Sequence, residues 1–142
     1  MQVAGSWTTE LAKLMVEQGA DVNKADIYGR TPLHVAAASD NAGLCLYLVS
    51  VGADREARTY IQLHTAVFFA ACYDACEALK VLVYNCKCQF DDLPLSPLRD
   101  SRFRTPLFVA AELGESLSLQ ISCIVTLDRA SLWHTTNNKH CY

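Results

Sequence analysis

The sequence lacks any surplus of basic residues, because 12 Lys and Arg stand against 15 Asp and Glu and give a formal net charge of −3. Without a positive field to attract phosphate, nucleic acid is not the expected partner. No apolar run reaches the roughly 18 residues that a membrane-spanning helix needs, so no membrane span is expected. The phosphate-cradling patterns GxxxxGK[ST] and GxGxxG are also missing, and we expect no nucleotide cofactor.

Charged residues are scarce as well, at 19%, whereas hydrophobic residues make up 51% of the 142 positions. This composition is typical of a chain that packs a core, and the length suits one domain. The cysteine count, seven, is odd, and the first residues lack the basic start and apolar centre of a secretory signal. We therefore expect reduced thiols in an intracellular protein, either cytoplasmic or nuclear.

Three stretches of nearly the same sequence follow one another: GRTPLHVAA (29–37), HTAVFFAA (64–71) and RTPLFVAA (104–111). Thr31 and Thr65 are 34 residues apart, Thr65 and Thr105 are 40 apart, and Gly19 and Gly52 are 33 apart. A 33-residue period with one insertion of a single residue and another of seven accounts for all three spacings. The same period aligns an apolar stripe in the first two units: Leu11, Leu14, Met15 and Val16 with Leu44, Tyr47, Leu48 and Val49.

Within a unit the local chemistry predicts two short helices. The Thr31 hydroxyl can cap the first helix, and Pro32 fits its first position because the missing N–H costs nothing there. The small side chains after Val35 let a neighbouring unit approach closely. A second helix, from about 42 to 51, ends at Gly52, which tolerates the left-handed conformation that stops a helix. The prediction is a helix–turn–helix followed by a hairpin-like loop, repeated along the chain.

Thr-Pro-Leu-His-x-Ala and Gly-Ala-Asp at these offsets resemble the ankyrin repeat, over about residues 7–114. The resemblance implies an all-α solenoid of about two complete and two partial repeats. It also implies that His34 is structural, its ring bonding the backbone of the loops between units. The predicted divisions are a partial first repeat with only an outer helix (1–25), two repeats (26–59 and 60–93), an inserted loop (94–103), a partial repeat (104–114) and a divergent tail (115–142).

The pattern fails at both ends and at one helix terminus. The first unit has an outer helix at 10–18 but no inner helix before it, and the tail has no further Gly-Ala-Asp. We therefore expect either a fragment of a longer array or a chain whose last part is foreign to the repeats. Cys86 stands where the preceding unit has Gly52, and a left-handed cysteine would cost roughly 1–2 kcal/mol. We expect Asn85 to end that helix instead.

Two cysteine pairs have short spacings that invite comparison with those of metal ligands. Cys72 and Cys76 are predicted to share a helix face and to pack as small hydrophobes, while Cys86 and Cys88 are too close for the usual zinc spacing. No Ser, Cys or Asp lies in a motif for nucleophilic catalysis. The expectation is a protein that is no enzyme and holds no metal or cofactor.

What the resemblance implies for function is a non-catalytic protein–protein interaction module, a scaffold or adaptor that binds a protein or peptide on its concave face. Carried over position by position, the predicted partner-binding residues are Ile27, Tyr28, Arg30, Ser39, Ile61, Gln62, His64, Tyr73, Arg102, Arg104 and Glu112. His64 is expected at an exposed loop tip. Two alternatives stay open: a substrate-recruiting part of a ubiquitin-ligase adaptor whose C-terminal box is missing, or a truncated, non-functional isoform. The chain is expected to be a monomer.

Overall fold

The computed structural model describes residues 2–86 and 99–114, and every regular element in these two ranges is helical. The all-α expectation is confirmed for this part of the chain. The elements are α1 (Gln2–Glu17), α2 (Pro32–Ala38), α3 (Ala42–Ser50), α4 (Ala66–Cys72), α5 (Cys76–Lys80), a π-helical turn η1 (Val81–Asn85) and α6 (Pro106–Leu113). Residues 94–98 of the predicted insertion, Cys88 and the whole predicted tail lie outside the described residues.

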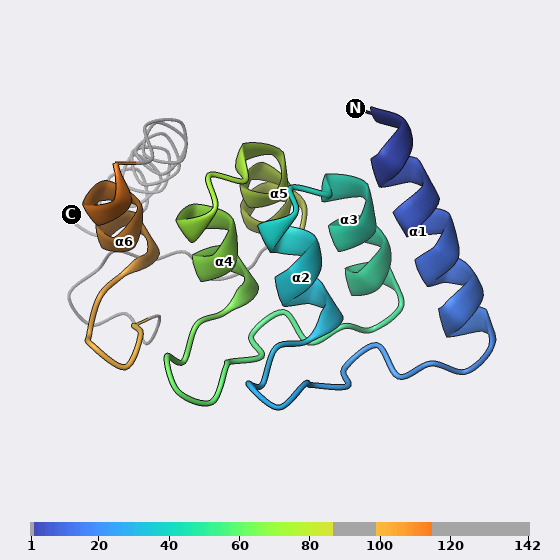
Figure 1. Cartoon of the computed structure of the whole chain (residues 1–142), viewed down its shortest axis with the longest axis horizontal. Helices are drawn as coiled ribbons and strands as arrows, with labels where there is room; N and C mark the ends of the chain where they lie inside the picture. Colours follow the sequence, from blue (N-terminus) through green and yellow to red (C-terminus); the bar gives the residue numbers. More distant parts are fainter. Residues whose placement is uncertain (1, 87–98, 115–142) are drawn as a thin grey trace, which may run out of the picture.

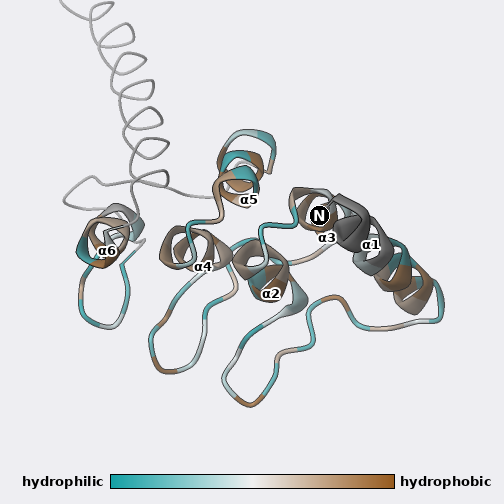
Figure 2. Cartoon of the chain, turned by 45° about the horizontal axis from the view of Figure 1, so that its top comes forward, coloured by the Kyte–Doolittle hydropathy of each residue, from teal (hydrophilic) through white to brown (hydrophobic). Residues whose placement is uncertain are grey.

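The helices form two rows, with α2, α4 and α6 in an inner row and α1, α3 and α5 in an outer row (Figure 1). In the inner row α2 packs on α4 and α4 packs on α6, while α1 packs on α3. The loops between units project together on the side of the inner row (Figure 2). The outer helix predicted at 10–18 in fact begins at Gln2, because no proline interrupts the sequence before it.

The helices of the inner row begin at equivalent threonines. Thr31, Thr65 and Thr105 are the N-cap residues of α2, α4 and α6, all with extended backbone, so the predicted register is confirmed. Thr105 caps its helix with the hydroxyl, which accepts a hydrogen bond from the N–H of Phe108 at 3.3 Å. Thr31 forms a capping box with His34, and its hydroxyl lies 2.9 Å from Nδ1 of that ring.

Small side chains let the two inner helices α2 and α4 come together. Ala36, Ala37, Ala70 and Ala71 are fully buried, as the repeat predicted for the first two. Leucines from both rows fill the space around them. Cys45 lies in the same core, where burial raises the pKa of its thiol to about 12. It is therefore a packing residue.

The turns that end the helices differ from unit to unit. Gly52 follows α3 with φ of +99°, the left-handed value that was predicted. The prediction that a left-handed Asn85 ends the helix of the next unit early is wrong, because the π-helical turn η1 runs through Asn85, which does not have a positive φ, and the cap residue Cys86 stays right-handed at φ −84°. The prediction that Cys72 and Cys76 share a helix face is wrong, because Cys72 ends α4 and Cys76 begins α5 after a turn.

Candidate protein-binding site

The loop before α2 is held by one aspartate. Asp26 Oδ1 accepts hydrogen bonds from the N–H groups of Tyr28 and Arg30, both at 2.9 Å, and Oδ2 accepts one from Arg30 Nε at 2.7 Å. The guanidinium of Arg30 lies 5.1 Å from the centre of the Tyr28 ring, within cation–π range. The turn therefore fixes the backbone that carries Tyr28 and neutralises Arg30.

The loop before α6 repeats this network. Asp100 Oδ1 accepts from the N–H groups of Arg102 and Arg104 at 2.8 Å, and Oδ2 accepts from Arg104 Nε at 2.9 Å. Burial opposes the charge of Asp100, but the bonds from Arg104 and Arg102 outweigh it and lower the pKa of that carboxyl. Residues 100–103, assigned from the sequence to the inserted loop, thus belong to the fourth unit. The shared pattern Asp-x-x-x-Arg-Thr-Pro was the signal for this.

The middle loop, before α4, carries the one-residue insertion. The backbone N–H of Thr59 donates to the His64 carbonyl at 3.0 Å, and the Thr59 hydroxyl accepts from the His64 N–H at 3.1 Å. The three loops are joined to one another by further backbone bonds, from Tyr60 to the Tyr28 carbonyl at 3.0 Å and from Ser101 to the Gln62 carbonyl at 2.9 Å. The tips therefore form one connected edge along the stack.

His34 links two units, as the family resemblance implied. Its Nδ1 accepts from the Thr31 N–H at 3.1 Å, so the ring proton is on Nε2, which donates to the His64 carbonyl at 3.0 Å. The ring is buried, and burial lowers its pKa despite the bond to the carbonyl. The expectation of a structural histidine is confirmed.

His64 does not lie exposed at the loop tip, so that prediction is wrong. Only 8% of the residue is exposed, its ring stacks on Phe68 at 4.8 Å between centres, and Nε2 lies 3.4 Å from Asp100 Oδ2. Phe68 occupies the position that His34 has in the preceding unit, and it has no polar group that could bond to the next unit. His64 makes that contact instead, through Asp100. Burial lowers the pKa of His64, and the Asp100 carboxylate opposes the shift.

A groove of about 370 Å³ opens between the loop tips and α4. Its lining comprises Tyr28, Arg30, Thr59, Ile61, Gln62, Phe69 and Tyr73. Five of these were predicted from the sequence as partner-binding residues, and the structure brings them together. Ile61 and Tyr73 are 75% and 65% exposed, so they contribute little to the core. Phe69 was missed, although its alignment with the exposed Val35 was a usable signal; its ring centre is 6.1 Å from that of Tyr73.

Comparison with known proteins agrees with this geometry. Residues 1–59 match a family model described as ankyrin repeats (3 copies). This stretch of the chain consists of ankyrin repeats. Human protein phosphatase 1 regulatory subunit 27 is 44% identical over 52 residues, which are 37% of this chain and 34% of that protein. The ankyrin repeat and LEM domain-containing protein 1 homolog of Caenorhabditis elegans is 43% identical over 53 residues, 36% of this chain and 8% of that protein.

A longer match, to alpha-latrotoxin-Lg1a of Latrodectus geometricus, is 31% identical over 110 residues, 74% of this chain and 8% of the toxin. The chain thus spans about a third of the phosphatase subunit and less than a tenth of the other two proteins. The name of the Caenorhabditis elegans protein also refers to ankyrin repeats, and no catalytic domain is identified by the comparisons.

The remaining predicted contact residues lie outside the groove. Ile27 is 84% exposed, and Arg102 is also exposed. Ser39 is exposed, with its hydroxyl donating to the Val35 carbonyl of its own helix at 3.0 Å. Arg104 is only partly exposed and bridges two carboxylates, that of its own turn and that of Glu112 at 2.6 Å. Arg104 therefore mainly stabilises the loop before α6.

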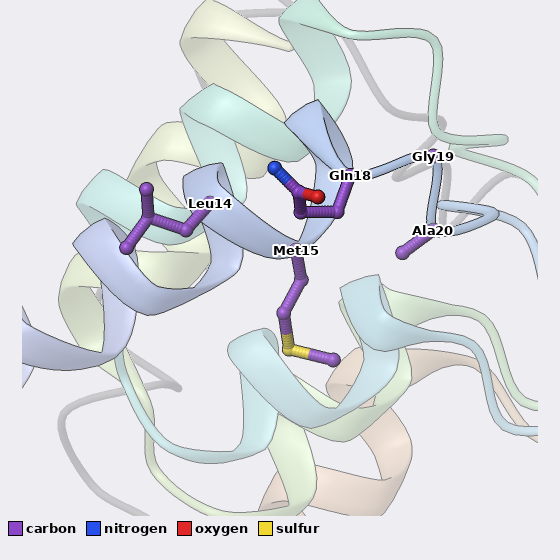
Figure 3. Close-up of a pocket in the computed structure, with 5 residues that line it drawn as sticks. All are labelled: Leu14, Met15, Gln18, Gly19 and Ala20. Carbon is purple, nitrogen blue, oxygen red and sulfur yellow. The ribbon is translucent and has the colours of Figure 1, made fainter.

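A second hollow, of about 450 Å³, lies at the end of α1 and is lined by Leu14, Met15, Gln18, Gly19 and Ala20 (Figure 3). No inner helix accompanies α1 among the described residues. Met15 is therefore 55% exposed, whereas Leu48, at the same place in the next ankyrin unit, is 3% exposed beside α2. The hollow was not predicted as a binding site.

The cysteines offer no site chemistry in the part of the chain that the structure describes. Cys45, Cys72 and Cys86 are free thiols, the Cys76 thiol donates to the Asp74 carbonyl at 3.4 Å, and burial raises the pKa of Cys72 to about 11. No three His, Cys, Asp or Glu side chains gather there as metal ligands would. Nor does any helix in the described ranges have the length and apolar character to cross a membrane.

Proposed function

We propose that this chain is a non-catalytic binding module that holds another protein, or a peptide segment of one, in the groove between the loop tips and α4. The observation that carries the proposal is the convergence of Tyr28, Ile61, Phe69 and Tyr73 on one hollow while three of them, Tyr28, Ile61 and Tyr73, are more than half exposed. Tyrosine and arginine side chains dominate binding energy at protein interfaces, and both line this groove. Large exposed apolar side chains that gather in this way mark interaction sites.

The framework behind the groove suits it for binding. The neighbouring tips are joined by backbone hydrogen bonds, and the turn of Tyr28 is fixed by Asp26. A surface that is already ordered loses little conformational entropy when a partner binds. We place the protein inside the cell, in the cytoplasm or nucleus, because Cys45, Cys72 and Cys86, in the part of the chain that the structure describes, are free thiols.

The test is site-directed photo-cross-linking. A photo-reactive amino acid replaces Tyr73 in the groove or, as the matched control, Tyr84 in η1 of the outer row, which is 49% exposed. Cross-linked proteins recovered from cells through Tyr73 but not through Tyr84 are the expected result. Equal recovery of the same proteins from both positions would contradict a partner site on the concave face.

One named candidate can be tested in the same experiment. The likeness to a regulatory subunit of protein phosphatase 1 makes that phosphatase a candidate partner. It should then appear among the proteins cross-linked through Tyr73. Its absence would remove this candidate and leave the binding-module proposal to the other partners recovered.

A further inference from the structure

The groove offers side chains to a ligand rather than a free strand edge. The carbonyl groups of Tyr28 and Gln62 at its border already accept hydrogen bonds from the next loop. What remains for a ligand are aromatic and aliphatic surfaces, together with donors on Tyr28, Gln62 and Tyr73. A segment whose own carbonyls are unpaired could use those donors while its apolar side chains enter the groove.

The spacing of the stack selects one backbone conformation for such a segment. The helices α2, α4 and α6 pack side by side, and packed helices lie about 8–10 Å apart. A polyproline II helix has three residues per turn and a rise of about 3.1 Å, so every third side chain points the same way at about 9.3 Å. Same-face side chains of a β-strand recur at about 6.8 Å, which does not match the unit repeat.

The charges at the border of the groove indicate which type of ligand residue should lie one unit further along the stack. Arg102 follows Ser101, whose N–H is bonded to the Gln62 carbonyl, so it stands at the border of the groove. Its guanidinium is exposed and makes no ion pair with the residues that the structure describes. Arg30 is neutralised by Asp26, and Arg104, in the same turn as Arg102, lies between the carboxylates of Asp100 and Glu112. Of these three arginines, Arg102 is therefore the one that could pair with an acidic residue of a ligand.

We propose that the groove binds an extended, polyproline-type peptide segment, with a proline or aliphatic residue seated among Tyr28, Ile61, Phe69 and Tyr73 and an acidic residue three positions along, against Arg102. This inference rests on the proposed function, since it names the chemistry of the partner for the same groove. Aromatic-lined grooves are a recurring way of binding preformed polyproline segments. The pairing of the ligand's acidic residue with Arg102 determines the position of the segment along the groove.

The experiment is a selection from a displayed library of random peptides of about twelve residues, which span roughly 37 Å when extended. The library is panned against the full chain, and the enriched peptides are titrated by fluorescence anisotropy against three variants. Tyr73→Ala should weaken binding at least tenfold, and Tyr84→Ala should leave it unchanged. Arg102→Glu should weaken acid-bearing peptides about threefold to fivefold, with a smaller loss at high salt, because a rim charge is screened.

The expected consensus is an apolar or proline residue followed at the third position by Asp or Glu. Enriched peptides with apolar residues at alternate positions, or at helical spacing, would overturn this inference while leaving a binding module in place. Consensus peptides that bind the Tyr73→Ala variant as well as the parent would overturn it also. If no peptide is enriched, the peptide inference fails, and the cross-linking at Tyr73 decides separately whether a folded partner uses the groove.

Discussion

Thr65 and Thr31 occupy the same position in neighbouring units, yet we predict opposite effects when each is changed to valine. Thr65 is 1% exposed, and its Oγ1 has no hydrogen-bond partner among the residues that the structure describes. Thr31 Oγ1, by contrast, lies 2.9 Å from Nδ1 of His34. The difference arises because Phe68 stands in the third unit where His34 stands in the second.

The magnitudes follow from this single difference. A buried polar group without a partner costs about 1–3 kcal/mol, and valine replaces the hydroxyl with a methyl group of nearly the same size. The Thr65 side chain makes no capping bond that the change could remove. We expect Thr65→Val to raise the free energy of unfolding by about 1 kcal/mol. Thr31→Val removes a bond within a buried network and should lower it by about 1 kcal/mol.

The measurement is thermal unfolding followed by circular dichroism, with urea titration as a second probe. The melting temperature should rise by roughly 3 °C for Thr65→Val and fall by a similar amount for Thr31→Val. The double variant should lie close to the parent, because the two sites belong to different units. Destabilisation by both single changes would mean that the Thr65 hydroxyl has a partner, and the account of the Phe68 exchange would fail.

Three other predictions concern the same framework. Burial lowers the pKa of His34 and His64 below the ordinary 6.5, so stability should fall as the pH drops through that value. The melting temperature, followed from pH 7.5 to 5, should show less of this fall in a His64→Gln variant. Gly29→Ala should cost about 2 kcal/mol in urea unfolding, since φ is +81° and the new Cβ would lie 2.8 Å from the backbone N of Tyr60; a cost below half of that would contradict the contact. Asp40 accepts a hydrogen bond from the first turn of α5 and has φ of +53°. Asp40→Ala should therefore lower the free energy of unfolding by about 2 kcal/mol and Asp40→Asn by under about 0.5 kcal/mol, as compared by thermal unfolding.

The architecture was predictable because the residues that define the repeat have strong local conformational preferences. A threonine before a proline, a pair of alanines and a glycine at fixed offsets each impose a local conformation, and three copies in register support one another. The start of α1 was not predictable in this way, since an uninterrupted helical sequence carries no start signal. The left-handed end predicted at Asn85 was wrong, because a π-helical turn carries the helix through that residue and no local signal in the sequence indicated the turn.

The candidate site was predictable in its members and not in its details. Tyr28, Ile61 and Tyr73 follow from the repeat register alone, because the register says which positions face the concave side. His64 was misplaced because its environment depends on an exchange elsewhere in the unit, at Phe68, and on Asp100 from a loop 36 residues away in the sequence. Long-range contacts of that kind leave no trace in the local pattern.

The groups that hold the stack together and the groups that line the groove are largely different ones. Two of the links between units are the buried His34 ring, which donates to the His64 carbonyl, and the Asp40 carboxylate, which accepts from the N–H of Ala78. Ile61 and Tyr73 take part in none of the hydrogen bonds that join units within residues 2–86 and 99–114, and both are mostly exposed. Truncating either side chain should therefore leave the melting temperature nearly unchanged, since little buried surface is lost. Loss of ligand binding in such a variant, at unchanged stability, would be an effect on the groove alone.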